Sequence, residues 1–402
     1  MRLCFVISAF SDSTFSLVKA LLSAGHDVDT YYCSHQEGSF MSSAFEVTTN
    51  TKRTLGEIQE LNQFNSRGVS FIDSYPNSHI YLVRTFKTGD RSQGIKQKVI
   101  RRVFAYYYKK IAKIIANKHY DYIDIISQSY PIIQLYKYIP KANVLFSFHE
   151  VLNTHLKNGM VIPVIKTLLE DGYTIRVFSK KSKLDITSRM NIDDSQIHVV
   201  PFGLYTSYLE FGNITMPEIE DFDNYILQYG FIEPYKGLSV LYDSLRILEE
   251  RGIKINVVVA GRGHDSILEK MSNKDNFRLI NRFLSSDELA YLIQNSKFIV
   301  CPYLSSSQSG IPQTVFVFKK PIIATRVGTF EELIKNPLMG CLINPNDSKG
   351  LAEAIEELYT NAHLYNECVA NIDAFESGES KCGWDRIICK YQRCLSTIKH
   401  NK

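Results

Sequence analysis

The stretch from Tyr225 to Arg251 decides the fold class, and it reads YILQYGFIEPYKGLSVLYDSLRILEER. Its first residues, Tyr225–Tyr229, are mostly apolar and predict a buried strand. Apolar side chains at helical spacing from Leu238 to Arg251 predict a helix, and the apolar run Ile253–Ala260 predicts a second strand. A strand, a helix and another strand in this order form a βαβ unit, the building block of parallel sheets.

The same alternation extends to both sides of this unit. Toward the C-terminus, we expect strands and helices in turn over Arg278–Ile280, Ser286–Asn295, Phe298–Pro302, Ile311–Phe318, Pro321–Ala324 and Leu351–Tyr359. Toward the N-terminus, we expect strands over Arg2–Ser8, Asp27–Tyr32, Asp121–Ser127, Ala142–Phe148, Thr174–Ser179 and His198–Pro201. Sheets of this kind bind ligands at the carboxyl ends of their strands. The sequence therefore predicts an α/β protein with two doubly wound, Rossmann-like domains that face a central cleft.

Length and composition agree with two globular domains. At 402 residues, the chain exceeds what one hydrophobic core usually organises. Its 45% apolar and 22% charged residues are typical of a globular protein. The net charge of +4 is too small for a general nucleic-acid binder, which neutralises many phosphates. Eight cysteines without metal-ligand spacing, and no signal peptide or membrane-spanning run, predict a cytoplasmic protein with reduced thiols and no bound metal.

Two loops offer groups that bind phosphate. In the first, Lys236 and Gly237 stand between a strand and a helix, where an ammonium group, backbone N–H donors and a positive helix end meet. The second loop belongs to the stretch Cys301–Phe318, CPYLSSSQSGIPQTVFVF, whose serines and Gly310 precede a predicted helix. The simpler interpretations are a surface lysine and a Ser-rich helix cap. Spacing alone leaves both open.

Taken together, these segments resemble the donor-binding domain of retaining glycosyltransferase family four. The resemblance rests on the YKG turn, the segment VVVAGRG at Val257–Gly263, the loop PY...SQSG, the strand KPIIAT, and Glu332 four places after the glycine of VG. Order and spacing agree over Ile226–Leu358. In the first half, FSFHEVLNTH at Phe146–His155 and VVPFG at Val199–Gly203 are similar to family motifs, and Trp384–Cys394 is similar to the family's terminal helix.

The resemblance implies the GT-B fold and a division of the chain. We expect an acceptor-side domain at residues 1–205, a linker at 206–223, a nucleotide-sugar-binding domain at 224–378, and a C-terminal helix at 379–402 that crosses back to the first domain. The implied activity is hexosyl transfer from a UDP- or GDP-sugar to a saccharide or lipid-linked acceptor, with retention of anomeric configuration. The implied setting is bacterial polysaccharide biosynthesis. No cofactor and no metal are implied.

The resemblance also implies roles for individual residues. His149 would lie beside the transferred sugar, and Glu332 would bind the ribose hydroxyls. The remaining donor-binding positions would surround the diphosphate, and they are Lys236, Gly237, Arg262, Gln308, Ser309, Gly310 and Ile311. A cation and helix N-terminal amides stabilise the charge that grows on a leaving diphosphate. For His149 alone, a hydrogen-bonded core histidine is the simpler interpretation.

Several positions depart from the family pattern. Two glutamates that are common in the family correspond here to Ser306 and Thr314, and an arginine of the diphosphate turn corresponds to Phe231. These changes favour the alternative of a catalytically silent GT-B protein that binds a nucleotide or a partner. Epimerisation and phosphorolysis on the same fold fit the motifs less well. The Asp27-Val28-Asp29 run has the Asp-x-Asp spacing of metal-dependent glycosyltransferases, but it falls inside a predicted strand, and we expect a solvated face or edge there.

A basic amphipathic helix is predicted at residues 95–118. Between Arg91 and Lys118 the chain has nine Lys or Arg and no Asp or Glu, interleaved with apolar residues at helical spacing. Such a helix could rest on anionic lipid or steer a lipid-linked acceptor, which would bring the protein to the inner face of the membrane. The simpler interpretation is a helix packed on the first sheet with a solvated basic face.

Overall fold

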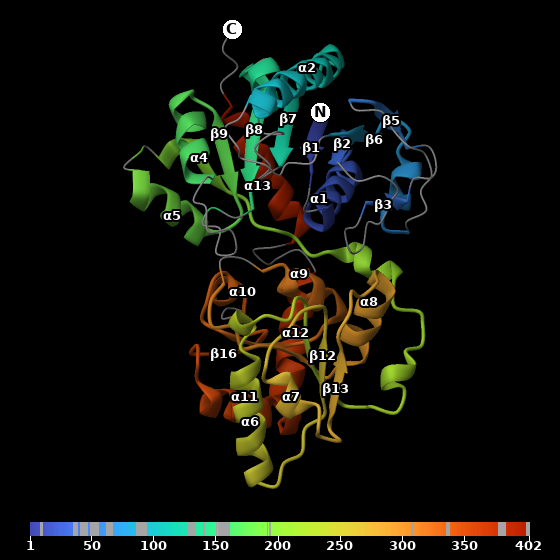
Figure 1. The fold of residues 1–402 in the computed structure, drawn as a ribbon, viewed down its shortest axis with the longest axis vertical. Helices are drawn as coiled ribbons and strands as arrows, with labels where there is room; N and C mark the ends of the chain where they lie inside the picture. The colour runs from blue at the N-terminus through green and yellow to red at the C-terminus, as the bar shows by residue number, and fades with distance from the viewer. Residues whose placement is uncertain are drawn as a thin grey trace. The chain divides into compact units, whose positions relative to one another are not determined.

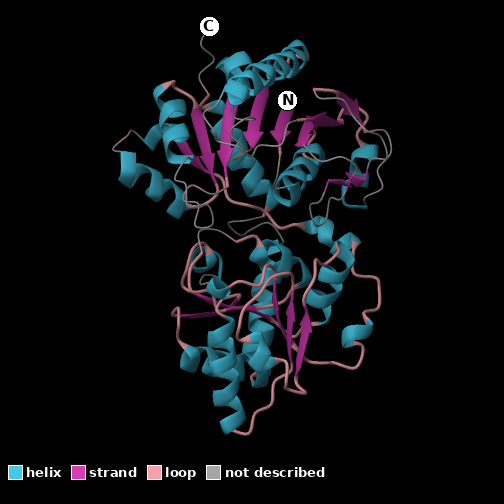
Figure 2. Ribbon diagram, in the orientation of Figure 1, coloured by secondary structure: helices cyan, strands magenta, loops and turns pink. Residues whose placement is uncertain are grey.

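The computed structural model divides the chain into two compact units (Figure 1). Unit 1 comprises Met1–Gly203 together with Trp384–Lys402, and unit 2 comprises Leu204–Gly383. The structure describes residues 1–8, 11–34, 39–40, 47–48, 56–61, 67–85, 95–126, 134–139, 141–149, 151, 161–190, 192, 194–306, 309–334, 338–376 and 383–398. Each unit is built around its own largely parallel sheet, as Figure 2 shows.

The sheet of unit 1 has eight strands in the order β10-β9-β8-β7-β1-β2-β6-β5. Their bounds are β1 Arg2–Ile7, β2 Asp27–Ser34, β5 Ile58–Glu60, β6 Ile80–Arg84, β7 Tyr122–Ile126, β8 Val144–Phe148, β9 Thr174–Val177 and β10 Ile197–Val199. All neighbours pair in parallel except β5, which runs antiparallel to β6. A separate antiparallel pair joins β3 Ser39–Phe40 to β4 Val47–Thr48. The helices are α1 Ser11–Ser23, α2 Ile95–Asn117, α4 Val161–Glu170, α5 Lys180–Met190 and α13 Trp384–Ser396.

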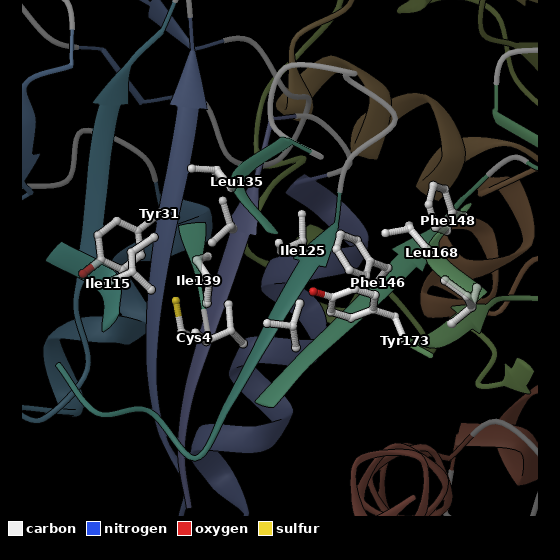
Figure 3. Packing of buried hydrophobic residues seen from close by; sticks show 14 of the residues in the cluster. Cys4, Tyr31, Ile115, Ile125, Leu135, Ile139, Phe146, Phe148, Leu168 and Tyr173 are labelled. Carbon is white, nitrogen blue, oxygen red and sulfur yellow. The ribbon is translucent and has the colours of Figure 1, made fainter. Parts of the chain in front are cut away.

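Alternation along β1 sends side chains to two different cores, because successive residues of a strand point to opposite faces. Cys4 belongs to the cluster on one face, where Ile115 of α2 and Leu168 of α4 cover the sheet (Figure 3). Phe5 faces the other way, and its ring is stacked at 6.1 Å from the ring of Tyr391 in α13. The C-terminal helix is therefore part of the packing of unit 1.

A buried charge network fixes α13 to this sheet. Asp124 of β7 accepts hydrogen bonds from Ser147 at 2.7 Å, Arg176 at 3.2 Å and Tyr391 at 2.9 Å. Asp124 and Arg176 are both almost inaccessible to solvent. A buried carboxylate is costly without partners, and these three donors offset that cost for Asp124.

The sheet of unit 2 has six strands, all parallel, in the order β13-β12-β11-β14-β15-β16. Their bounds are β11 Ile226–Tyr229, β12 Val257–Ala260, β13 Phe277–Ile280, β14 Ile299–Cys301, β15 Ile322–Thr325 and β16 Gly340–Ile343. The helices are α6 Leu238–Glu250, α7 Leu268–Met271, α8 Ser286–Asn295, α9 Ile311–Val315, α10 Phe330–Ile334, α11 Ser348–Thr360 and α12 Ala362–Glu376. The strand order reverses between β11 and β14, and open α/β sheets bind ligands at such a reversal.

Local sequence signals account for several helix starts in unit 2. Helix α8 begins with a capping box in which the Ser285 side chain and Glu288 each bond the other's backbone N–H. The Asp347 side chain caps α11 by accepting from the Gly350 N–H at 2.8 Å. The residues between 206 and 223 also belong to this unit, where Met216, Ile219 and Phe222 are buried.

Some elements were not predicted from the sequence, among them the strands β5, β6 and β16 and the helices α4, α5, α7, α10 and α12. The expectation of a solvated face or edge at Asp27-Val28-Asp29 was wrong, because Asp29 is buried in the sheet. Asp29 accepts a hydrogen bond from the His79 N–H at 3.0 Å and from the Tyr120 hydroxyl. No helix in the described part of the chain combines the length and the apolar character that crossing a bilayer requires.

Candidate functional site

Two loops of unit 2 lie together at the carboxyl ends of β11 and β14. Their described residues are 230–237 in the first loop and 302–306 with 309–310 in the second, and the Leu304 N–H joins the loops by donating to the Tyr235 carbonyl at 2.8 Å. Gly237 has φ +72°, and a Cβ at this position would lie 1.9 Å from the Pro302 carbonyl oxygen. Only glycine fits such a contact. The glycine of the YKG turn is therefore required for the close approach of the two loops.

Lys236 brings an ammonium group to this junction. Its Nζ donates to the Tyr303 hydroxyl at 2.6 Å and lies 4.0 Å from the centre of the Tyr303 ring. Burial lowers the pKa of Lys236 to about 8, because a charged amine is less stable away from water. None of the described carboxylates forms an ion pair with Lys236. The ammonium is thus half-buried at the reversal of the sheet, held by a neutral phenol and an aromatic face.

Tyr303 is the central residue that sequence analysis missed. It is buried, its carbonyl accepts from the Thr325 hydroxyl at 2.6 Å, and its ring packs edge-on against Phe330 with centroids 5.4 Å apart. Burial raises the pKa of Tyr303 well above its usual value, so the hydroxyl stays protonated beside Lys236. The tyrosine of the PY pair after β14 was visible in the sequence, but nothing there indicated that it would contact Lys236.

The turn after β12 lies against the turn after β11. A Cβ on Gly261, which has φ +143°, would lie 1.9 Å from the Gly230 carbonyl oxygen, so the two backbones touch. In this turn, Arg262 lies beside the exposed ring of Phe283. The Arg262 guanidinium lies 5.0 Å from the centre of the Phe283 ring, and Phe283 meets Phe231 edge-on at 6.1 Å. We call Arg262, Phe231 and Phe283 the aromatic platform; Phe283 was not singled out from the sequence.

The Ser-rich loop caps its own helix. The Ser309 hydroxyl accepts from the Ile311 N–H at 3.3 Å, and the Gly310 carbonyl accepts from both the N–H and the hydroxyl of Thr314 at 3.3 Å. The hydroxyl of Thr314, the residue that the resemblance aligns with a family glutamate, thus contacts the backbone of the loop. Gln308 lies outside the described residues.

Glu332 is exposed in the first turn of α10. Its helix starts at Phe330, whose ring packs against Tyr303, the residue that holds Lys236. The neighbouring Glu331 is engaged elsewhere, in an ion pair with Arg326 at 3.2 Å. Tyr303 thus contacts both Lys236 and the first residue of α10. Glu332, two residues further along, is exposed to solvent.

His149 belongs to unit 1, directly after β8. It is buried, its Nε2 lies 3.2 Å from the Ser13 hydroxyl, and its ring packs on Phe178 at 4.4 Å and Phe202 at 4.9 Å. Burial, followed by the nearby charge of Arg176, lowers the pKa of His149 well below its usual value. The imidazole is therefore neutral at physiological pH. These surroundings match the hydrogen-bonded buried histidine that the sequence left open as the simpler interpretation.

Comparisons with known proteins agree on the family. Residues 215–374 match the family model described as glycosyl transferases group 1. The chain is 29% identical over 212 residues to the O-antigen chain mannosyltransferase C of Escherichia coli, which covers 51% of this chain and 55% of the relative. It is 22% identical over 169 residues to the phosphatidyl-myo-inositol mannosyltransferase of Mycobacterium leprae, covering 41% and 44%. The chain thus spans about half the length of these curated relatives.

Solved structures match the whole chain in fold. A glycosyltransferase from Rickettsia africae has a TM-score of 0.66 at 16% identity, covering 100% of this chain and 99% of that one. Anabaena HepE, solved in complex with UDP and glucose, has a TM-score of 0.63 at 12% identity, covering 99% and 100%. At these identities the similarity concerns the fold. The family resemblance and the α/β fold that were expected from the sequence are confirmed: residues 215–374 are similar to the glycosyl transferases group 1, and the whole chain has the GT-B fold.

Proposed function

We propose that the protein is a retaining glycosyltransferase that moves a hexosyl group from a UDP- or GDP-sugar to a saccharide or lipid-linked acceptor. One observation carries the proposal: the Lys236 ammonium lies at the reversal of the unit 2 sheet, without a carboxylate partner among the described residues. A partly buried cation without an anionic partner is disfavoured, and a diphosphate would supply that partner when it binds. The match of residues 215–374 to the glycosyl transferases group 1 and the UDP bound to HepE support this interpretation.

The same groups fit the chemistry of the leaving diphosphate. Negative charge grows on the diphosphate as the glycosidic bond breaks, and a preorganised ammonium stabilises that charge. Tyr303 fixes the position of Lys236, so little reorganisation is needed during the reaction. The leaving diphosphate can also accept the proton of the acceptor hydroxyl. A site without paired carboxylates is therefore sufficient for this transfer.

We propose that the nucleoside of the donor binds next to Lys236, on exposed groups of unit 2. The exposed rings of the aromatic platform offer a face for the base, and stacking of a base on an aromatic ring contributes about 1–3 kcal/mol. Glu332 offers a carboxylate for the two ribose hydroxyls. His149 would contact the transferred sugar as a neutral hydrogen-bonding group, in line with its lowered pKa.

The alternative of a catalytically silent nucleotide-binding protein has one supporting observation. Thr314 stands where the family has a glutamate, and both its N–H and its hydroxyl are directed to the Gly310 carbonyl. This position therefore offers a donor's sugar no carboxylate. A silent protein would bind the nucleotide through Lys236 and release no nucleoside diphosphate from any sugar donor.

Release of nucleoside diphosphate tests the proposal. The protein would be incubated with a panel of UDP- and GDP-sugars and mixed saccharide acceptors, and the released UDP or GDP would be measured by chromatography. We expect release with at least one donor and a loss of about 100-fold or more in Lys236→Ala. Lys254→Ala is the matched control, because Lys254 is exposed near the amino end of β12 in the same sheet. Nucleotide binding without release from any donor would instead support the silent protein.

A further inference from the structure

Helix α2 of unit 1 has one face that builds the core. Tyr108, Ile111, Ala112 and Ile115 are buried and belong to the cluster that covers the unit 1 sheet (Figure 3 labels Ile115). These positions recur at intervals of three and four, so they lie on one side of the helix. The packing of α2 on the sheet is therefore complete without the residues on its opposite side.

The opposite face exposes three large apolar side chains. Val99 is 55% exposed, Val103 39% and Tyr106 68%. Their spacings of four and three residues place them on one stripe, turned away from the buried residues of the same helix. Scattered apolar residues on a surface need no explanation, but three that are aligned on one helix face form a contiguous apolar strip. In Figure 1, α2 lies along the outer margin of unit 1.

Cations share this stripe with the apolar residues. Arg102, Lys109, Lys110 and Lys113 are all exposed, and each lies three, four or seven positions from Tyr106. None of the four forms an ion pair with a carboxylate in the described part of the chain. The sequence from Arg91 to Lys118 contains no Asp or Glu. The exposed face is therefore both apolar and uniformly positive.

Charge complementarity selects the occupant of this face. Two copies of the chain would place like charges opposite each other, which disfavours a symmetric contact through α2. A nucleic acid would satisfy the cations but leave Val99 and Val103 without apolar contacts. An anionic lipid surface satisfies both sets of groups, because its phosphates pair with the cations and its acyl boundary accepts the apolar side chains.

We propose that α2 is a membrane-docking helix that lies in the headgroup layer of an anionic bilayer. Val99, Val103 and Tyr106 insert toward the acyl chains, and the aromatic ring of Tyr106 occupies the interface that such rings prefer. Arg102, Lys109, Lys110 and Lys113 bind lipid phosphates around them. The docking surface is separate from the residues of unit 2 that are proposed to bind the donor, so it does not depend on catalysis.

Vesicle flotation tests the docking surface. The full chain would be mixed at about 0.1 M salt with vesicles of phosphatidylcholine alone or of phosphatidylcholine and phosphatidylglycerol in about equal parts. We expect binding only to the anionic vesicles. A charge variant, Arg102→Gln with Lys109→Gln, Lys110→Gln and Lys113→Gln, and an apolar variant, Val99→Ser with Val103→Ser and Tyr106→Ser, should each lose about tenfold or more of the bound fraction.

A matched control removes the same charge from unit 2. It combines Arg246→Gln, Lys254→Gln, Lys270→Gln and Lys349→Gln, all at exposed positions. This variant should bind anionic vesicles like the unchanged protein, and circular dichroism should show that every variant is folded. The proposal is overturned if the charge variant binds as well as the control. It is also overturned if the apolar variant binds fully and duplex DNA displaces it, since that result indicates a general polyanion site.

Discussion

Two cations that pack on tyrosine rings, one in each unit, differ in burial and in partners: Arg176 is buried and Lys236 is half-buried. Arg176 in unit 1 lies 5.0 Å from the ring of Tyr391 and pairs with Asp124, whereas Lys236 in unit 2 lies 4.0 Å from the ring of Tyr303 and pairs with no described carboxylate. Both are held by a tyrosine. The difference is the anion, which the fold supplies to Arg176 as Asp124 and which we propose a ligand supplies to Lys236. A cation whose charge is balanced internally stabilises the structure, and one whose charge is not balanced is available for binding.

Breaking the internal pair should have the largest effect on stability. Arg176→Met leaves Asp124 buried without its counter-charge, and we expect the free energy of unfolding to fall by about 3–5 kcal/mol. Guanidinium denaturation followed by circular dichroism measures this, with hydrogen exchange in β7 and β9 to locate the loss in unit 1. Arg278→Met is the control, because Arg278 also lies over a ring, that of Phe222, but pairs with no described carboxylate. Equal losses in the two variants would contradict the comparison.

Removing Lys236 should leave stability nearly unchanged and weaken nucleotide binding. Lys236→Met keeps an apolar stem against Tyr303, and it removes a charge that burial disfavours. We expect the dissociation constant for UDP or GDP to rise by roughly 10- to 100-fold, the effect of losing one hydrogen bond to a charged group. Isothermal titration calorimetry and thermal unfolding on the same sample separate the two effects. A large loss of stability with unchanged nucleotide affinity would contradict this account, because it would give Lys236 a structural role and not a binding role.

Nucleotide binding should also depend on pH, with a smaller effect than the Lys236→Met substitution, and affinity should fall as pH rises. Burial lowers the pKa of Lys236 to about 8, so the charged form that binds the diphosphate is depleted as pH rises through that value. We expect affinity to weaken about tenfold between about pH 7 and about pH 9, because the protonated fraction falls by that factor. Lys236→Arg keeps its charge over this range and should show a flat profile. Titration calorimetry across this pH range measures the affinity. An affinity of the unchanged protein that does not vary with pH would contradict the prediction.

Much of the fold could be predicted because local signals and tertiary structure agree. Strands β1, β11 and β14 are apolar runs that are buried on both faces of their sheets, and such runs are typical of parallel sheets. Strand β6 was missed because it follows no helical segment that could be recognised as its partner. Asp29 was misjudged because a carboxylate in a strand suggests solvent, and the partners that allow its burial come from His79 and Tyr120, far along the chain.

The candidate site was predicted in part for the same reason. Lys236 and Gly237 stand next to each other in the sequence, so their place between strand β11 and helix α6 could be predicted from local signals. Tyr303 and Phe283 meet their partners only after the sheet has formed, so residue spacing contains no sign of either contact. The dual character of α2 was visible as a pattern, but only the structure separates its core face from its exposed face.

The titration of Lys236 tests the account most directly. Lysine side chains labelled with carbon-13 at Cε would be followed by nuclear magnetic resonance from about pH 6 to about pH 11, and Lys236→Arg identifies the signal. We expect a midpoint at about 8 without ligand, which moves upward by about one pH unit or more when UDP or GDP is added, because a bound diphosphate stabilises the charged amine. A midpoint that is the same with and without saturating nucleotide would contradict the claim that Lys236 binds the diphosphate.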